Sequence, residues 1–334
     1  MEKVAPRMPG PSPVVALSLP THRNEIQAIS SRIVKRLLQS QNALPLANTS
    51  GPNVEGSQHE KLLFSIANGQ PIVLVILGFP AKSPNREKTL GDLPDLGEVE
   101  GLRSLENLCR DIQAIHRPGA RVIVCSDGHV FSDLIGVSDE TVDRYHIGIQ
   151  EIIRKFRFSH LSTFSLRHIY GRGNYSEMRD RLLDDYGESI DWIRQRSASS
   201  EAGRSLFNGI HRFVFEDRLS IHKTMSRNRN RVLAKETAYR IIQRSHAFSC
   251  LVQGTFSHAI RLSIHPQPVM GAKIGIKLLP SDDRWATPWH NVLLRESRGA
   301  EGFRLVPQKE AVRLGGRLKF YEGYAYFDLG WEIP

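Results

Sequence analysis

Two loops of the sequence hold side chains suited to anion binding and proton transfer. Each loop follows an apolar run; the candidates are Lys82, Ser83 and Lys88 in the first loop and Asp127 and Asp133 in the second. Ammonium groups bind phosphate or carboxylate, and a carboxylate transfers protons as a general acid or base. If the two runs are neighbouring parallel strands, both loops lie at the carboxyl ends, where open sheets bind ligands. We therefore expect one cavity, positive on one wall and acidic on the other.

Signatures of cofactor and metal sites are absent from the sequence. Neither GxGxxG nor GxxxxGK[ST] occurs, which argues against a nicotinamide or nucleotide site, and HExxH is also missing. Cys109, Cys125 and Cys250 form no CxxC pair, so neither a disulfide framework nor a thiolate zinc site is indicated. We expect no cofactor and no metal.

Apolar periodicity indicates which elements position the two loops. Near-continuous apolar runs, typical of strands buried on both faces of a parallel sheet, occur at 71–79, 121–126 and 161–166. Apolar residues at helical spacing occur at 23–40, 99–116 and 139–157, the last with Ser138 or Asp139 as N-cap. This alternation predicts an α/β fold with a Rossmann-like, mostly parallel sheet and helices on both faces.

The C-terminal half changes from helices, near 175–187 and 229–246, to short strands. The strands are expected at 258–265, 273–279, 291–296, 303–306 and 324–329. Their close, turn-bounded spacing indicates antiparallel pairing, either as an extension of the first sheet or as a second layer. We expect residues 1–20 to be a disordered tail and residues 21–334 to form a single α/β domain.

The formal net charge of +10 is concentrated in one stretch. Residues 211–244 contain nine Lys or Arg and only three Asp or Glu. Such density indicates an anionic partner, either phosphate on a small molecule or nucleic acid, and the alternative is a solvated helix face. No apolar run reaches the ~20 residues that span a bilayer, and no signal-peptide pattern is present. We expect a cytoplasmic protein without a membrane partner.

Three segments carry a resemblance to a known family. GFPAKSPNREKTLGDLPDLGEVEGLRSL (78–105), SDGHVFSDLIGVSDETVDRY (126–145) and HAIRLSIHPQP (258–268), the last followed by KIGIKLLP and TPWHNVLL, stand in order over roughly residues 70–300. They resemble the signatures of the isocyanide synthases, also called the pyoverdine/dityrosine biosynthesis family.

The resemblance implies a specific reaction. An amino acid's amine, with tyrosine or tryptophan as the expected substrate, would attack the ketone of ribulose 5-phosphate to give an imine. Retro-aldol-like cleavage on both sides of that carbon would leave an isocyanide. The resemblance implies no metal or redox cofactor, and a downstream oxygenase as a pathway partner.

Within that reaction the first loop would bind anions. Lys82 and Lys88 are the leading phosphate or carboxylate contacts, with a surface salt bridge to Asp92 as the alternative for Lys88. Schiff-base catalysis is a further option for Lys82, ranked lower because the substrate brings its own amine.

The second loop supplies the leading acid/base candidates. Asp127 begins a turn before Gly128, where capping backbone N–H groups is an equal alternative to catalysis. Asp133 lies beside Phe131 and Leu134, where partial desolvation would tune it for proton transfer.

Further candidates lie in the C-terminal half. Alternation along 258–265 places Arg261, Ser263 and His265 on one face, for binding a carboxylate and relaying protons. Lys277 would join them, and His290 is another acid/base candidate, with a structural hydrogen bond as the alternative. A basic helical stripe, with Arg229, Arg231 and Lys235 as candidates, would hold phosphate if it faced the cavity.

Two other functions compete with isocyanide synthesis. One is a nucleic-acid-binding protein that uses the basic stretch, although no zinc-finger, RRM or KH signature is present and aromatics are not interleaved for base stacking. The other is a different sugar-phosphate lyase or isomerase on the same scaffold. Neither of these functions uses an amino acid as substrate. An assay for amino-acid conversion therefore distinguishes both from isocyanide synthesis.

Overall fold

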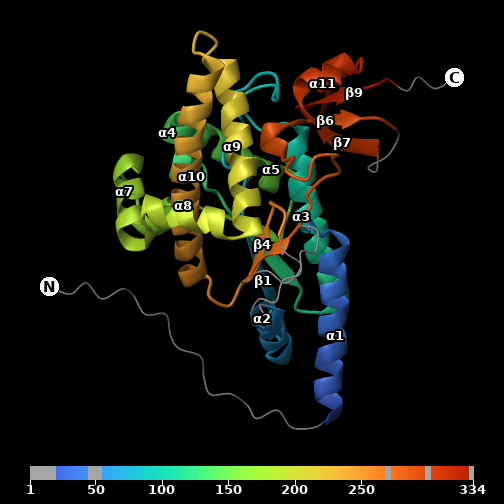
Figure 1. Ribbon diagram of the computed structural model, residues 1–334. Helices are drawn as coiled ribbons and strands as arrows, with labels where there is room; N and C mark the ends of the chain where they lie inside the picture. The colour runs from blue at the N-terminus through green and yellow to red at the C-terminus, as the bar shows by residue number, and fades with distance from the viewer. Residues whose placement is uncertain (1–19, 44–54, 268–271, 298–301, 331–334) are drawn as a thin grey trace.

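The computed structural model describes residues 20–43, 55–267, 272–297 and 302–330 (Figure 1). The tail expected over residues 1–20 lies, apart from its last residue, outside these ranges.

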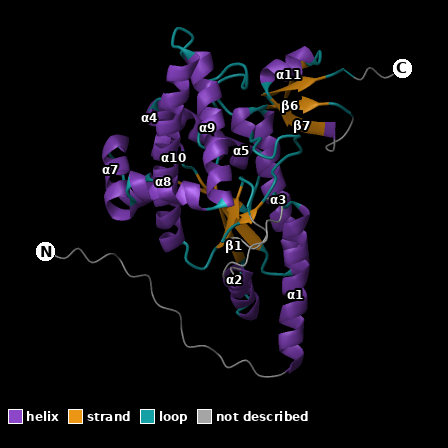
Figure 2. Ribbon diagram, in the orientation of Figure 1, coloured by secondary structure: helices purple, strands orange, loops and turns teal. Residues whose placement is uncertain are grey.

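A five-stranded parallel sheet forms the centre of the molecule (Figure 2). Its strand order is β3-β2-β1-β4-β5, with β1 at Ile72–Leu77, β2 at Ala120–Cys125, β3 at Leu161–Phe164, β4 at Ile260–Ser263 and β5 at Ile274–Gly275. All four strand pairs are parallel. The central strand β1 is apolar along its whole length because both faces of the sheet are covered.

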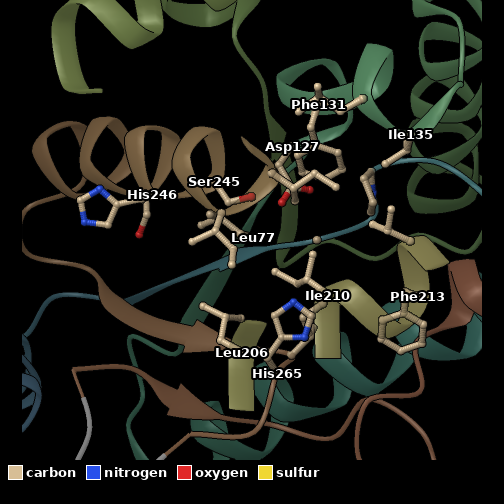
Figure 3. A pocket seen from close by; sticks show the side chains of 18 of the residues that line it. Leu77, Asp127, Phe131, Ile135, Leu206, Ile210, Phe213, Ser245, His246 and His265 are labelled. Atoms are coloured by element: carbon tan, nitrogen blue, oxygen red, sulfur yellow. The ribbon is translucent and has the colours of Figure 1, made fainter. Parts of the chain in front are cut away.

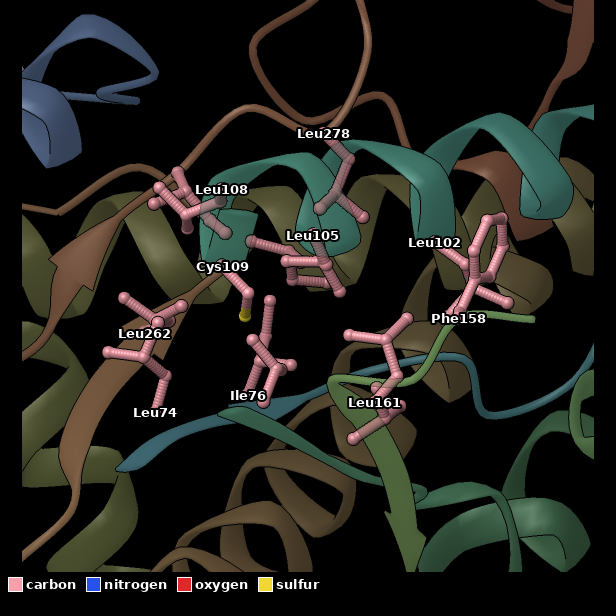
Figure 4. Packing of buried hydrophobic residues seen from close by; sticks show 14 of the residues in the cluster. Leu74, Ile76, Leu102, Leu105, Leu108, Cys109, Phe158, Leu161, Leu262 and Leu278 are labelled. Carbon is pink, nitrogen blue, oxygen red and sulfur yellow. The ribbon is translucent and has the colours of Figure 1, made fainter. Parts of the chain in front are cut away.

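Alternate residues of β1 enter two separate cores. Leu74 and Ile76 belong to the larger core (Figure 4), whereas Val75 belongs to the core on the opposite face. Helices that pack residues into the larger core are α1 (Pro20–Gln39), α2 (Glu55–Ala67), α3 (Leu96–Ile115) and α5 (Asp139–Lys155). Those of the opposite core are α4 (Gly128–Ile135), α7 (Tyr175–Tyr186) and α10 (Arg227–Thr255). The sheet is therefore covered on both faces.

Three further helices complete the segment between β3 and β4. They are α6 (Arg167–Tyr170), α8 (Ile190–Ser199) and α9 (Glu201–Ile221). Both α8 and α9 pack against α10, and Figure 1 shows α9 running alongside it. This helical layer lies over the end of the sheet at which the candidate loops emerge.

A second, four-stranded sheet follows in the C-terminal part. Its order is β7-β6-β9-β8, with β6 at Val292–Arg295, β7 at Phe303–Val306, β8 at Arg317–Tyr321 and β9 at Tyr324–Asp328. The β6–β9 pair is parallel and the other two are antiparallel. The 3-10 turn η1 (Pro288–His290) leads into this sheet, and α11 (Gln308–Arg313) follows β7.

The predicted α/β fold class is confirmed, with two corrections to strand pairing. β4 and β5 were expected to pair antiparallel. Both instead join the first sheet in parallel, with β4 paired to β1 and β5 paired to β4. β8 was not expected, although Arg317–Tyr321 alternates polar and apolar residues over its first four positions; all five of its residues are exposed. Helices α2, α4, α6, α8, α9 and α11 were also missed, α4 because its residues were expected to form a loop, whereas Ser138 caps α5 as one of the two expected N-caps.

Candidate functional site

A cavity of about 790 Å³ opens at the carboxyl ends of β1, β2 and β4. Leu77 ends β1, Asp127 follows β2, and Ser263 ends β4; all three line it. Helices α4, α8, α9 and α10 supply much of the remaining wall, together with loop residues and the turn at 288–290. Figure 3 shows Asp127 and Phe131 on one side of the cavity and Leu206, Ile210 and His265 on the other. This is the edge at which open parallel sheets bind ligands.

The two candidate loops meet because their backbones pack closely. Phe79 leaves β1 with a φ of 55°, in the left-handed region, and turns the chain into Pro80. A Cβ at Gly128 would lie 2.1 Å from Pro80 O and 2.6 Å from Val142 Cγ1, so only glycine fits there. Residues of both loops line the cavity. The expected shared cavity is present.

Lys82 does not face this cavity, contrary to the expectation. Its Nζ lies 2.7 Å from Asp95 Oδ2 and 2.8 Å from Glu98 Oε2, and it donates to Pro288 O at 2.9 Å. Burial opposes its charge, yet the two carboxylates together hold the pKa of Lys82 above its usual value. An ammonium enclosed in this way has no surface left for phosphate or for nucleophilic attack.

Lys88 is also neutralised within the protein. Its Nζ lies 2.7 Å from Asp217 Oδ1 and 2.8 Å from Glu216 Oε2, both on α9. The alternative salt bridge with Asp92 is wrong, because Asp92 pairs with Arg86 at 2.6 Å. Ser83 does line the cavity, but its Oγ donates to Asp217 Oδ2 at 2.8 Å. The first loop thus forms one wall without making it positive.

Asp127 lines the cavity with a carboxylate that the protein leaves unpaired. Its Oδ1 is buried without a hydrogen-bond partner in the described part of the chain. Asp127 is the N-cap residue of α4, but its side chain makes no capping bond, so the capping alternative is wrong. Burial raises the pKa of Asp127 to about 7, against smaller opposing effects of its own backbone N–H and of Lys273. A carboxyl group with this pKa can both take and give a proton near neutral pH.

Asp133 lines the cavity but is exposed and ion-paired. Its Oδ1 lies 2.6 Å from Arg244 Nη1 and 3.6 Å from Arg179 Nε. The expected desolvation is wrong, because Asp133 lies at the solvent-facing end of α4 and two arginines hold it. We no longer include it among the acid/base candidates.

His265 and Ser263 reach the cavity, whereas Arg261 from the same run does not. Nδ1 of His265 is buried without a partner among described residues, and burial followed by the charge of Lys273 lowers the pKa of His265 to about 4. Ser263 Oγ accepts from His265 N at 3.2 Å. Arg261 is buried and donates from Nη1 and Nη2 to Ser249 O and Oγ, at 3.1 and 2.9 Å.

His290 and Trp289 form the wall nearest the second sheet. His290 Nδ1 lies 3.2 Å from Thr287 Oγ1, and its ring stacks on Phe213 with centroids 4.7 Å apart. Burial, followed by the charge of Lys88, holds the pKa of His290 well below its ordinary value. Trp289 is buried against Phe79 and also lines the cavity.

The remaining predicted cations lie elsewhere. Arg229, Arg231 and Lys235 are exposed on α10, outside the cavity lining, and Arg231 stacks on Phe215 at 5.6 Å. This stripe is a solvated helix face. Lys277 also lies outside the lining and donates to Ser281 O at 2.6 Å.

The cations that do line the cavity were missed. They are Lys273, before β5, Arg196 on α8 and Arg218 on α9, accompanied by His246 on α10. Lys273 stands four residues before Lys277 in the same run, so strand alternation puts both on one face and does not distinguish the lysine that lines the cavity. Arg196 lies over the Trp192 ring at 4.9 Å.

Neither a metal-binding group nor a membrane-spanning helix is present over the described ranges. No group of three or more His, Cys, Asp or Glu there could hold a metal ion. Nor does any helix within them have the length and apolarity needed to cross a bilayer.

Comparisons with known proteins point to one family. The family model described as pyoverdine/dityrosine biosynthesis protein matches residues 63–317. An L-tryptophan isonitrile synthase of Fischerella ambigua is 39% identical over 275 residues, which cover 82% of each chain. An L-tyrosine isonitrile synthase of Xenorhabdus nematophila is 36% identical over 307 residues, covering 90% of this chain and 91% of that one. The crystal structure of the PvcA protein from Pseudomonas aeruginosa matches with a TM-score of 0.84 at 35% identity, over 90% of this chain and 99% of that one.

Proposed function

Because the chain belongs to the pyoverdine/dityrosine biosynthesis family, we propose that it converts the amine of an L-amino acid into an isocyanide, with ribulose 5-phosphate as carbon donor. Relatives at 36–39% identity are named for that conversion of tryptophan and tyrosine. The observation that carries the proposal is Asp127: an unpaired carboxyl group with a pKa of about 7, in a cavity at the carboxyl edge of the sheet.

The size and lining of the cavity support two substrates bound together. A volume of about 790 Å³ lies toward the upper end of small-molecule sites. Its α8 and α9 walls are apolar, with Trp192, Leu206, Ile210 and Phe213 among the lining residues. We assign this part to an aromatic amino-acid side chain, tyrosine or tryptophan. Arg196, which has no carboxylate partner within the described ranges, is our choice for the sugar's phosphate.

The proposed chemistry needs proton transfers at one carbon. The amine and the ketone carbon condense with overall loss of water, which gives an imine. Cleavage of the carbon–carbon bonds on either side then leaves the isocyanide on the amino acid. Asp127 takes the amine proton and returns protons to leaving groups, and the neutral His265 ring can accept a hydrogen bond at Nδ1. The sugar supplies the carbon at a suitable oxidation level, so the proposal includes no redox cofactor and no metal.

The setting of the reaction follows from its substrates. A sugar phosphate is charged and does not cross a bilayer unaided, so we place the reaction in the cytoplasm. The isocyanide product would pass to a downstream oxygenase in the same pathway.

A mass-spectrometric screen tests the proposal. Purified protein is incubated with ribulose 5-phosphate and all twenty amino acids, and a parallel reaction omits the sugar. We expect one amino acid to gain a carbon and lose two hydrogens only when the sugar is present. Consumption of ribulose 5-phosphate without any amino acid would instead indicate a lyase or isomerase, and would refute the proposal.

A further inference from the structure

Lys273 differs from the other lysines near the site. Among described residues it is the lysine that lines the cavity, and its ammonium makes no hydrogen bond or ion pair there. Lys82 and Lys88 are each held by two carboxylates, and Lys277 donates to a backbone carbonyl. Lys273 therefore presents a free amine to whatever the cavity binds.

The surroundings of Lys273 favour its neutral form. Burial, followed by the charge of Arg261 on β4, lowers the pKa of Lys273 to about 8, and Arg196 on α8 acts in the same direction. Cys250 on α10 and Asp127 oppose the shift but do not cancel it. With this pKa about a tenth of the amine is neutral at pH 7, against well under a thousandth for an ordinary lysine. A neutral amine is the nucleophilic form.

Groups that transfer protons lie within electrostatic reach of the same amine. The charge of Lys273 acts on both Asp127 and His265, and each of these has a buried atom without a partner in the described chain. Dehydration of a carbinolamine needs an acid to protonate the departing oxygen and a base to take the nitrogen's proton. Asp127, whose pKa is about 7, can supply both functions in turn, and the neutral His265 ring can accept a hydrogen bond at Nδ1.

We propose that Lys273 is the nucleophile that first attacks the ketone of the sugar phosphate, so that the amino acid's amine enters by exchange with a lysine imine. This inference rests on the proposed function for the identity of the ketone. In the first step the Nζ–carbon bond forms and the carbonyl oxygen leaves as water with two protons. In the second step the amino-acid nitrogen bonds to the same carbon and Nζ departs as an amine. Neither step oxidises or reduces the carbon.

A lysine imine has a chemical advantage over direct attack. Once protonated it is a better electrophile than the ketone, so a dilute amine reacts with it faster. The alternative role for Lys273 is a charge contact to phosphate or carboxylate. That role does not need a neutral amine, and Lys273→Arg would preserve it.

Reductive trapping tests the inference on the whole chain. Protein, ribulose 5-phosphate and cyanoborohydride are mixed without any amino acid, and the protein is digested and mapped by mass spectrometry. We expect the peptide containing Lys273 to gain the mass of the sugar phosphate less one oxygen. Lys273→Arg should lose this adduct while it keeps the wild-type circular dichroism and melting temperature. Lys319→Arg, a matched change on exposed strand β8, should keep both the adduct and turnover.

The outcomes separate this inference from the proposed function. Isocyanide formation by the wild type without an adduct on Lys273, or an adduct on another lysine, would overturn the role of Lys273 alone. Lys273→Arg that keeps kcat and changes only KM would overturn it in favour of an anion contact. An adduct on Lys273 without isocyanide product from any amino acid would support the nucleophile and refute the amine conversion.

Discussion

Asp127 holds a carboxyl group that the fold buries without pairing it. Burial disfavours the charged form, and the pKa of Asp127 rises to about 7. An unpaired buried carboxylate lowers stability, and proteins retain such groups chiefly where chemistry needs them. At the residue scale, the buried carboxyl group of Asp127 indicates that the cavity is a site for chemistry.

The pH dependence of stability should report this burial. Since the pKa of Asp127 is higher in the folded than in the unfolded state, the folded protein keeps a proton that the unfolded chain loses between about pH 4 and pH 7. This group therefore makes the free energy of unfolding fall as pH rises through that window. Asp127→Asn should remove the effect, so its stability relative to wild type should increase between about pH 4.5 and pH 7.5. Urea denaturation at the two pH values measures it, and an unchanged difference would contradict the buried carboxylate.

Lys82 and Lys273 show how far sequence reasoning reaches at this scale. Lys82 follows β1 and Lys273 directly precedes β5, so both lie next to strands of the first sheet and their approximate positions are predictable. The direction of a flexible side chain is not, because it depends on which carboxylates the fold brings close. Lys82 turns away because Asp95 and Glu98 form the capping box of α3 within its reach. Nothing in the sequence places comparable carboxylates beside Lys273.

At the element scale, Lys82 connects the start of α3 to the turn η1. Its bonds to Asp95, Glu98 and Pro288 O tie the two elements together, and Tyr145 donates to Glu98 Oε1 at 3.0 Å. This contact fixes the turn that carries Trp289 into the cavity wall. Its role is therefore structural.

Removal of the Lys82 ammonium should destabilise the protein strongly. Lys82→Met leaves two carboxylates buried without a cation, which typically costs about 3–5 kcal/mol. Arg86→Met is the control, because its ion pair with Asp92 is exposed and should contribute less than about 1 kcal/mol. The free energy of unfolding in urea measures both. Equal effects of the two changes would contradict the structural role.

Gly128 decides whether the two candidate loops can approach each other. Gly128→Ala would force its Cβ against Pro80 O and Val142, and the backbone atom cannot move away as a flexible side chain would. We expect a loss of at least about 2 kcal/mol in unfolding free energy. Gly91→Ala is the control, because the Cβ added there would have no neighbouring atom within 4 Å and the φ of Gly91 is not positive. Thermal unfolding compares them, and a neutral Gly128→Ala would refute the close packing of the loops.

The elements themselves were predicted unevenly, for a physical reason. β1 and β2 are recognisable because strands buried on both faces need near-continuous apolar residues. The pairing of β4 beside β1 was missed because strand order depends on contacts between residues far apart in the chain. α9 was missed although Leu206, Ile210 and Val214 recur at helical spacing; these residues line the cavity, and only Gly209 and Val214 along the helix are buried.

At the scale of the whole molecule, the basic charge is distributed over separate local contacts. Arg212 pairs with Asp283 at 2.7 Å, Arg244 pairs with Asp133, and Arg227 stacks on Phe215 at 5.4 Å. Arg218 lines the cavity. These contacts take up part of the basic charge, and the short exposed stripe of Arg229, Arg231 and Lys235 on α10 remains.

Salt-dependent binding should therefore be weak. A nucleic-acid-binding protein that contacts 6–10 phosphates loses roughly 10³–10⁵ in affinity between about 50 and 200 mM salt. We expect early elution from heparin and no such steep loss for a DNA duplex measured by fluorescence anisotropy. Strong retention on heparin with a steep salt dependence would instead favour nucleic-acid binding by the basic stretch.

The central claim is that the cavity containing Asp127 is where an amine becomes an isocyanide. Ribulose 5-phosphate labelled with ¹³C at the ketone carbon tests it most directly, with wild type and Asp127→Asn assayed side by side by ¹³C NMR and mass spectrometry. We expect the isocyanide carbon to carry the label and the variant to turn over at least about a hundredfold more slowly. An unlabelled product, or a variant as fast as wild type, would contradict it.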